Sequence, residues 1–185
     1  MTLGDTLDRD RPVVRAAKSA DLERVLEVER RAFGGDIEAE LVRALVYDGE
    51  AFIVGLSLVA EEAGTVVGHV LFTRASCGGG VSAVLLAPLA VVPERQQRGV
   101  GTLLVREGLE QARALGFGLV LVLGDPAYYT RFGFGPAAAH GITPPYPVDP
   151  ADAWMVLELQ PGVLAEAVGV VGLAEAFRDP ALWRE

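Results

Sequence analysis

The sequence has few of the residues that cross-link a chain or bind metals. It holds a single cysteine, Cys77, so no disulfide can form within the chain. Its two histidines, His69 and His140, lie far apart and have no cysteine or aspartate at the spacing of a zinc site. The sequence therefore predicts no internal disulfide and no metal centre, and Cys77 is expected to be a buried apolar residue.

Long apolar runs are also missing. No stretch approaches the roughly 20 consecutive apolar residues that a membrane-spanning helix needs. The first twelve residues, MTLGDTLDRDRP, lack the apolar region of a secretory signal. We therefore expect a cytoplasmic protein without a membrane span.

Basic residues are in the minority. The chain has 16 Lys and Arg against 25 Asp and Glu, which gives a net charge of −9 at pH 7. Because proteins bind nucleic acid largely by neutralising phosphates, we expect no nucleic-acid partner. The acidic balance is compatible with a cationic substrate, although solubility alone also accounts for it.

The composition is that of one globular domain. The chain has 185 residues, of which 51% are hydrophobic and 22% are charged. We expect a single domain over residues 1–185. Residues 1–11 are polar and are expected to be flexible. Residues 161–185 are expected to form a C-terminal extension, and residues 169–173 have the composition of a final strand.

The hydrophobic pattern switches between strand and helix periods. Strands are expected at residues 12–17, 57–64, 65–75, 83–93, 119–124 and 154–159. Helices are expected at residues 22–33, 37–45 and 101–116. A short helix should follow Asp125, with Asp125 as its cap and Pro126 at its first position. Ser19 or Asp21 is expected to cap the first helix.

These elements indicate an α/β fold, more closely an α+β arrangement with a mixed central sheet flanked by helices. The strand, helix and strand over residues 83–124 form a right-handed crossover unit with parallel strands. Pro88 lies within the first of these strands. Because proline cannot donate to a strand ladder, Pro88 predicts a bulge or an edge.

A glycine-rich loop, PERQQRGVG, joins that strand to the helix. Gly99 and Gly101 let a ligand approach the backbone, and a helix that begins there offers unpaired amides and a partial positive charge. Gln96, Arg95 and Arg98 add donors. The loop therefore predicts a site for a phosphate-bearing ligand, although a tight turn would also account for the glycines.

Two other phosphate-binding loops fit less well. A P-loop requires Gly-Lys-Ser/Thr, and no lysine follows Gly101, which argues against ATP and GTP. A dinucleotide fingerprint would use Gly99 and Gly101, with Asp125 near the ribose, but Leu104 stands where the third glycine belongs. A nicotinamide-dependent oxidoreductase remains an alternative.

The segment LAVVPERQQRGVGTLLVREGLEQARALG resembles the acetyl-coenzyme A segment of the GNAT N-acetyltransferases. Gln96, Gly99 and Gly101 match that family's Q/R-x-x-G-x-G/A signature. Leu89, Val91 and Pro93 match its L-x-V-x-P, and Tyr129, Gly133 and Phe134 match its Tyr-x-x-x-Gly-Phe. The stretch LGDPAYYTRFGFGPAAAHGI further resembles predicted acetyltransferases of the YhbS-like branch.

The resemblance implies the GNAT fold and acetyl-CoA as the cosubstrate. It implies that the pantetheine arm pairs with backbone between diverging strands, where the amide near Val91 polarises the thioester carbonyl, and that Tyr129 is the general acid. The pyrophosphate would lie on the amides of residues 97–102. The cofactor residues that it implies are Leu89, Ala90, Val91, Gln96, Gln97, Arg98, Gly99, Val100, Gly101 and Thr102.

The acceptor and the general base are not readable from the sequence. The resemblance implies an amine acceptor, and the acidic balance favours a small, cationic one. Candidate bases are Glu29, Asp36, Glu61 and Glu62, each of which is also expected as a solvated surface charge. An acyl-CoA sensor without catalysis is the main alternative function. A homodimer through C-terminal strands also stays open.

Overall fold

A mixed, twisted sheet runs through residues 11–183, the part of the chain that the computed structural model describes. Within this part the order of the strands is β1–β2–β3–β4–β5–β8–β6, and β9 pairs with both β3 and β7. Parallel pairs join β4 to β5 and β7 to β9, whereas the other pairs are antiparallel. The strands are β1 (Val13–Ala16), β2 (Phe52–Glu62), β3 (Thr65–Gly78), β4 (Ser82–Val91), β5 (Leu119–Leu123), β6 (Gly135–Pro136), β7 (Ile142–Thr143), β8 (Trp154–Glu158) and β9 (Val168–Gly172).

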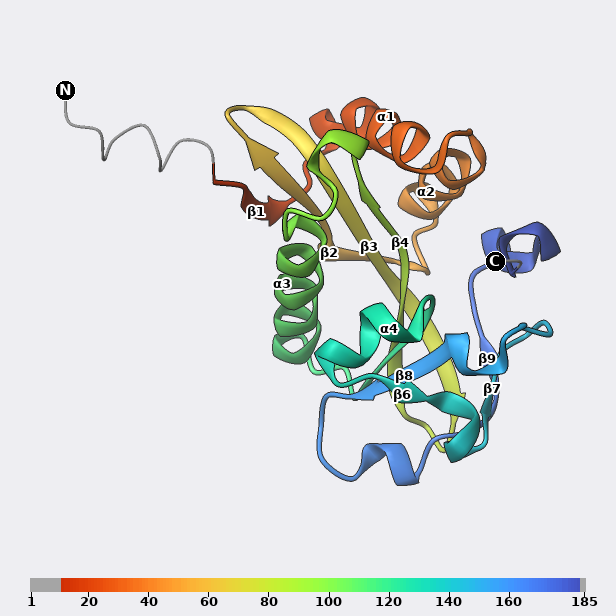
Figure 1. Cartoon of the computed structure of the whole chain (residues 1–185). Helices are drawn as coiled ribbons and strands as arrows, with labels where there is room; N and C mark the ends of the chain where they lie inside the picture. The colour runs from red at the N-terminus through yellow and green to blue at the C-terminus, as the bar shows by residue number, and fades with distance from the viewer. Residues whose placement is uncertain (1–10, 184–185) are drawn as a thin grey trace.

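The helices cover both faces of this sheet (Figure 1). They are α1 (Leu22–Phe33), α2 (Ile37–Tyr47), α3 (Val100–Ala114) and the short α4 (Pro126–Tyr129). Successive residues of β3 point to opposite faces. Gly68 faces α3, where an added Cβ would lie 2.9 Å from Leu104 Cδ1, and His69 faces α1, where it contacts Glu29. The predicted mixed sheet flanked by helices is thereby confirmed.

Most expected elements form, with local corrections. The predicted parallel crossover from β4 through α3 to β5 is present, and residues 119–122 are buried as expected. The strand expected to begin at residue 57 begins at Phe52, because Gly55 at φ 90° and a register shift interrupt the alternating pattern that marks a strand. The two-residue strands β6 and β7 were not expected. The predicted flexibility of residues 1–11 lies outside the described residues except for Arg11.

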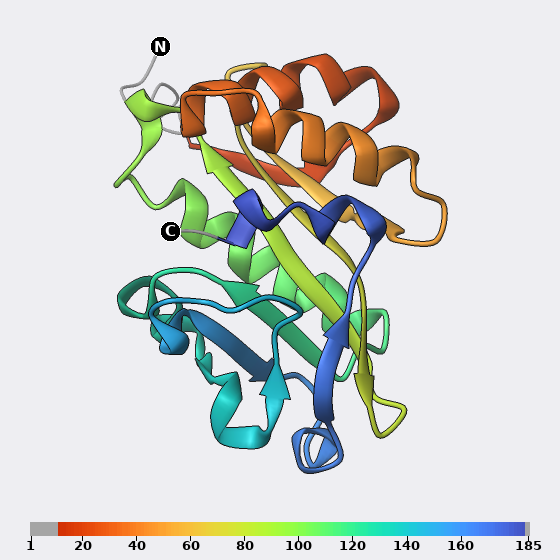
Figure 2. The ribbon, with the colours of Figure 1, turned by 90° about the vertical axis from the view of Figure 1, so that its right-hand side faces the viewer.

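The C-terminal residues return to the body of the fold. Strand β9 pairs with the far end of β3, at Ser76↔Gly172 and Gly78↔Val168. Two 3₁₀ turns follow, and Figure 2 shows this segment in blue as it crosses in front of β4 toward the C-terminus. We call residues 175–183 the C-terminal strap.

The strap is held by specific contacts. Trp183 Nε1 donates to the carbonyl oxygen of Phe177 at 2.9 Å, and Tyr146 Oη donates to that of Arg178 at 2.8 Å. The Trp183 ring packs against Trp154 and Tyr146, each with 5.8 Å between ring centroids. These contacts fix the strap beside β4. None of the described helices is both long and apolar enough to cross a membrane.

Candidate functional site

Strands β4 and β5 separate halfway along their length. They pair only from Ala83↔Leu119 to Leu86↔Val122, after which β4 continues to Val91 alongside β3 alone. The register between β3 and β4 shifts here, since Val70 and Phe72 oppose Leu89 and Leu86. The extra residue of β4 falls at Ala87 and Pro88, which a cis peptide bond joins. Of the bulge or edge predicted at Pro88, the bulge is therefore confirmed, and a gap opens beside it.

The unpaired edge of β4 turns backbone groups toward this gap. Val92 N–H donates to the carbonyl oxygen of Val67 in β3 at 3.0 Å. Because backbone groups alternate in direction along an antiparallel strand, Val91 and Leu89 point theirs away from β3. The Val91 carbonyl accordingly accepts a hydrogen bond from Gln96 Nε2 at 3.0 Å. The edge thus offers an incoming amide chain both donors and acceptors.

The loop after β4 brings its amides to the start of α3. Gln97 and Gly99 adopt left-handed conformations, with φ of 59° and 85°. Gly99 occupies the N-cap of α3 and has no side chain that could cap the helix. No acidic residue lies in the first turn of α3. A helix start without its own acceptor favours an external anion.

Two cavities flank this loop and the gap. The smaller, which we call the loop cavity, has a volume of about 350 Å³. The larger, which we call the gap cavity, has a volume of about 640 Å³. Leu89 and Tyr128 line both, so the two cavities meet at these residues. The loop cavity is lined by Leu89, Val91, Gln96, Gln97, Gly99, Gly101, Thr102, Tyr128 and Arg131.

Tyr128 closes one side of the loop cavity. Its hydroxyl shares a hydrogen bond with the Thr102 side chain, and burial raises the pKa of Tyr128 above 10.0 despite that bond. The Arg131 guanidinium lies over its ring, 4.6 Å from the centroid. A Cβ added to Gly101 would lie 2.8 Å from the Tyr128 hydroxyl. Only a residue without a side chain fits at position 101 while Tyr128 keeps this place.

Tyr129 lies at the wall of the gap cavity. It is 7% exposed and packs against Phe134, with 5.7 Å between ring centroids. A Cβ on Gly124 would come within 2.4 Å of its ring, so that glycine makes room for the tyrosine. The Asp125 side chain accepts from Ala127 N–H at 2.8 Å and caps the short helix α4, which confirms the predicted cap.

Comparison with known proteins identifies this arrangement. The family model described as "Acetyltransferase (GNAT) family" matches residues 21–134, more than half of the chain. The chain belongs to the GNAT acetyltransferase family. It is 45% identical over 146 residues to the uncharacterized N-acetyltransferase YjhQ of Escherichia coli K12, covering 76% of this chain and 80% of YjhQ. It is 38% identical to YhbS of the same strain, covering 80% of this chain and 87% of YhbS.

Two solved GNAT structures are similar over nearly the whole chain. The crystal structure of E. coli YhbS in complex with CoA has a TM-score of 0.84 and 35% identity, covering 90% of this chain and 92% of that one. A GNAT acetyltransferase of Brucella melitensis in complex with acetyl-CoA has a TM-score of 0.73 and 31% identity, covering 91% and 99%. The predicted GNAT fold is confirmed, and the chain is a member of a family of acyltransferases.

Most of the residues that the GNAT resemblance implied for the cofactor share the loop cavity. Ala90, Arg98 and Val100 do not line it. Ala90 and Val100 are buried, and Arg98 is exposed to solvent. Tyr128 and Arg131 line the cavity without having been predicted to do so. Tyr128 adjoins Tyr129 in the four-residue helix α4, which marks it as a candidate. The direction of the Tyr128 side chain, however, depends on how α4 packs on the sheet.

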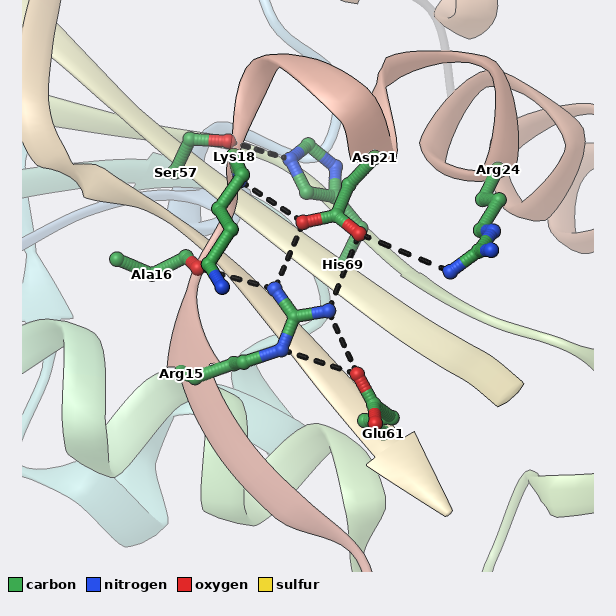
Figure 3. A network of polar contacts seen from close by, with 8 residues as sticks. All are labelled: Arg15, Ala16, Lys18, Asp21, Arg24, Ser57, Glu61 and His69. Carbon is green, nitrogen blue, oxygen red and sulfur yellow. Dashed lines mark hydrogen bonds and ion pairs between the residues drawn. The ribbon is translucent and has the colours of Figure 1, made fainter. Parts of the chain in front are cut away.

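None of the four candidate bases lines either cavity of this GNAT domain. Asp36 pairs with Arg30 at 2.8 Å, and Glu62 pairs with Arg95. Glu61 pairs with Arg15 at 2.6 Å, and Figure 3 shows Arg15 bridging Glu61 and Asp21. These contacts give three of the four carboxylates structural partners.

Glu29 is not a surface charge, contrary to expectation. It is fully buried, and its Oε1 lies 2.6 Å from His69 Nδ1, while His69 Nε2 lies 3.1 Å from Ser57 Oγ. Burial raises the pKa of Glu29 above 4.5, although the hydrogen bond with His69 opposes the shift. The network joins α1, β3 and β2, and it explains why a histidine occupies a buried strand.

Three further features of the GNAT site were missed at the sequence level. Phe33, Glu38 and the C-terminal strap all line the gap cavity. Each comes from a segment whose pattern indicates only a helix end or an extension. Cys77 is buried as expected. Among residues 11–183, no cluster of three or more His, Cys, Asp or Glu side chains has the arrangement of a metal site.

Proposed function

We propose that this chain transfers the acetyl group of acetyl-CoA directly to an amine. The observation that carries the proposal is the meeting of the two cavities at Leu89 and Tyr128, beside the unpaired edge of β4. One cavity suits the phosphates of the cofactor and the other suits the acceptor. The CoA and acetyl-CoA complexes of the two similar structures support acetyl-CoA as the cosubstrate.

The pyrophosphate would lie in the loop cavity. The amides from Gln97 to Thr102 begin α3, and Gly99 and Gly101 leave room for close approach. Left-handed Gln97 and Gly99 flank Arg98, which is not left-handed, and such alternation of backbone conformations can turn amides toward one concave side that suits an anion. Arg131, at the wall of this cavity, adds a positive charge.

The pantetheine arm would lie along β4 as an additional strand. The outward backbone groups of Leu89 and Val91 would pair with its amides. Leu89 lines both cavities whereas Val91 lines only the loop cavity, so Leu89 lies at the junction. We therefore assign the donor to the thioester carbonyl to Leu89 rather than to Val91. This amide would stabilise the oxyanion of the tetrahedral intermediate.

The reaction then needs one bond to form and one to break. The neutral amine attacks the carbonyl carbon of the thioester, a C–N bond forms, and the C–S bond breaks as the intermediate collapses. The amine loses a proton to a base or to water, and the thiolate gains one. Tyr129 lines the gap cavity near the junction and is the proposed acid for the sulfur.

Replacing Tyr129 with phenylalanine tests this assignment. We expect kcat to fall by roughly 100-fold, because a positioned acid contributes about that much. The acetyl-CoA affinity should hardly change. Amine-dependent release of free thiol measures the first quantity, and titration calorimetry measures the second. Tyr47→Phe, which alters a tyrosine 74% exposed on α2, is the matched control.

Two outcomes would contradict the proposal. If the wild-type chain does not bind acetyl-CoA, the proposal loses its cosubstrate and is wrong. Tight binding of acetyl-CoA without acetylation of any amine would favour an acyl-CoA sensor instead.

A further inference from the structure

The gap cavity is lined mainly by apolar and aromatic side chains. Toward the loop cavity it is bounded by Leu89, Tyr128 and Tyr129. Toward α1 and α2 it is bounded by Phe33, Leu41 and the C-terminal strap. The strap contributes Phe177, Ala181, Leu182 and Trp183. The cavity that adjoins the proposed thioester site therefore has mostly apolar walls, and a ligand with an apolar body would cover most of them.

Charges of one sign line this cavity. Its acidic side chains are Glu38, in the first turn of α2, and Asp125, at the N-cap of α4. None of the described residues that line it is Arg, Lys or His. Asp125 is engaged, because it accepts from the Ala127 amide. The Glu38 side chain has no ion pair or hydrogen bond with any residue from 11 to 183.

The surroundings of Glu38 strengthen its preference for a cation. The charge of Glu38 is one of the causes that raise the pKa of buried Glu29, so the two carboxyl groups lie within electrostatic range. One oxygen of Glu29, Oε2, is buried without a hydrogen-bond partner among the described residues. An ammonium ion beside Glu38 would lower the electrostatic cost of both groups.

We propose that the acceptor is a primary amine on an apolar body, which Glu38 holds by its ammonium group and the C-terminal strap covers. This inference rests on the proposed acetyl transfer and names the class of acceptor. An amino acid fits poorly, because its carboxylate would meet carboxylates without a cation among the described lining residues. A polyamine fits poorly, because its further ammonium groups would lie against apolar walls.

Three amines of similar size separate these classes. They are 2-phenylethylamine, L-phenylalanine and spermidine, each assayed with acetyl-CoA by thiol release. We expect kcat/KM for 2-phenylethylamine to exceed those for the other two by about tenfold or more, since each mismatch leaves a charge unpaired.

Glu38→Gln tests the role of the carboxylate. We expect KM for 2-phenylethylamine to rise by about tenfold or more, with a smaller change in kcat, since the variant loses a charge pair that positions the amine. The affinity for acetyl-CoA, measured by calorimetry, should not change. Glu40→Gln, an exposed carboxylate two residues further along α2, is the matched control and should leave both constants unchanged.

The outcomes distinguish this inference from the proposed function. Equal or better use of phenylalanine or spermidine, or an unchanged KM in Glu38→Gln, would overturn the amine class alone. Binding of acetyl-CoA with no turnover of any of the three amines would also overturn it. A chain that does not bind acetyl-CoA would overturn the proposed function first.

Discussion

Gly101 and the Tyr128 hydroxyl compete for one small space at the start of α3. The distance of 2.8 Å between that hydroxyl and a Cβ at position 101 is shorter than ordinary contact. A side chain at Gly101 would therefore displace Tyr128 from Thr102 and reduce the room in the loop cavity. The glycine pattern predicts a ligand at the backbone, and the structure adds that a tyrosine forms the opposite wall.

Gly101→Val is expected to weaken acetyl-CoA binding by about tenfold or more, because the added side chain occupies the proposed pyrophosphate site. Titration calorimetry checks the affinity, and circular dichroism checks that α3 still forms. Gly35→Val is the control, since a Cβ at Gly35 meets nothing within 4 Å. Unchanged affinity in the Gly101 variant would place the phosphates elsewhere.

At the scale of elements, an ion-pair network attaches the start of α1 to the sheet. Arg15 in β1 binds Asp21 before α1 and Glu61 in β2, at 2.7 and 2.6 Å (Figure 3). Asp21 also accepts from the Lys18 amide at 2.8 Å. The sequence suggested Ser19 or Asp21 as the helix cap, but neither side chain caps α1. The Asp21 carboxylate instead pairs with Arg15 of β1, which also pairs with Glu61 of β2. Asp21 thereby ties the start of α1 to the sheet.

The hydrogen bonds from Arg15 lower the pKa of Asp21 from 3.8 to about 2. The carboxylate thus stabilises the folded state above pH 3.8, and this contribution is lost as the pH falls through about 2. Asp21→Asn is expected to lower the free energy of unfolding by roughly 2 to 3 kcal/mol at pH 7. The difference from wild type should shrink as the solution is acidified.

Urea unfolding at several pH values measures both effects. Glu175→Gln, which removes an exposed pair with Arg178, serves as the control and should cost less than about 0.5 kcal/mol. A loss for Asp21→Asn that does not depend on pH would show that packing, rather than charge, explains it.

The periodicity of apolar residues predicts the long elements better than the short ones. Helices α1 and α3 have full amphipathic periods, and β5 is a continuous apolar run, so their sequences identify them. Strands β6 and β7 have two residues each, too few to show any period. They exist because β8 and β9 offer them pairing edges. Such pairing is decided by tertiary contacts.

At the scale of the whole molecule, ligand binding should increase the stability of the folded state. A ligand present at about 100 times its Kd stabilises the folded state by about 2.7 kcal/mol. For a domain of this size, that corresponds to a rise in Tm of roughly 5–10 °C. Acetyl-CoA is expected to produce this shift in a thermal unfolding experiment, and NADPH is expected to produce none. A shift with NADPH alone would revive the oxidoreductase hypothesis.

The candidate site shows the same division between local and distant information. Gln96, Gly99 and Gly101 lie close together in the sequence, and their spacing indicates a phosphate loop. Glu38 lies more than a hundred residues before Phe177 and Trp183, and it meets them only because the strap returns across β4. Likewise, Glu29 and His69 are 40 residues apart, and neither pattern identifies the other as its partner.

The sequence by itself determined the family, the order of the main elements, an interruption of regular strand pairing at Pro88 and the loop proposed to bind phosphate. These depend on neighbouring residues, whose spacing sets backbone conformation and exposes or buries a given face. Only the tertiary structure decided that Tyr128 joins the two cavities, that Glu29 is buried against His69, and that Glu38 lines the mostly apolar gap cavity together with the strap. Those features depend on the directions of side chains from distant segments, which are fixed when the helices and the C-terminal residues pack on the sheet.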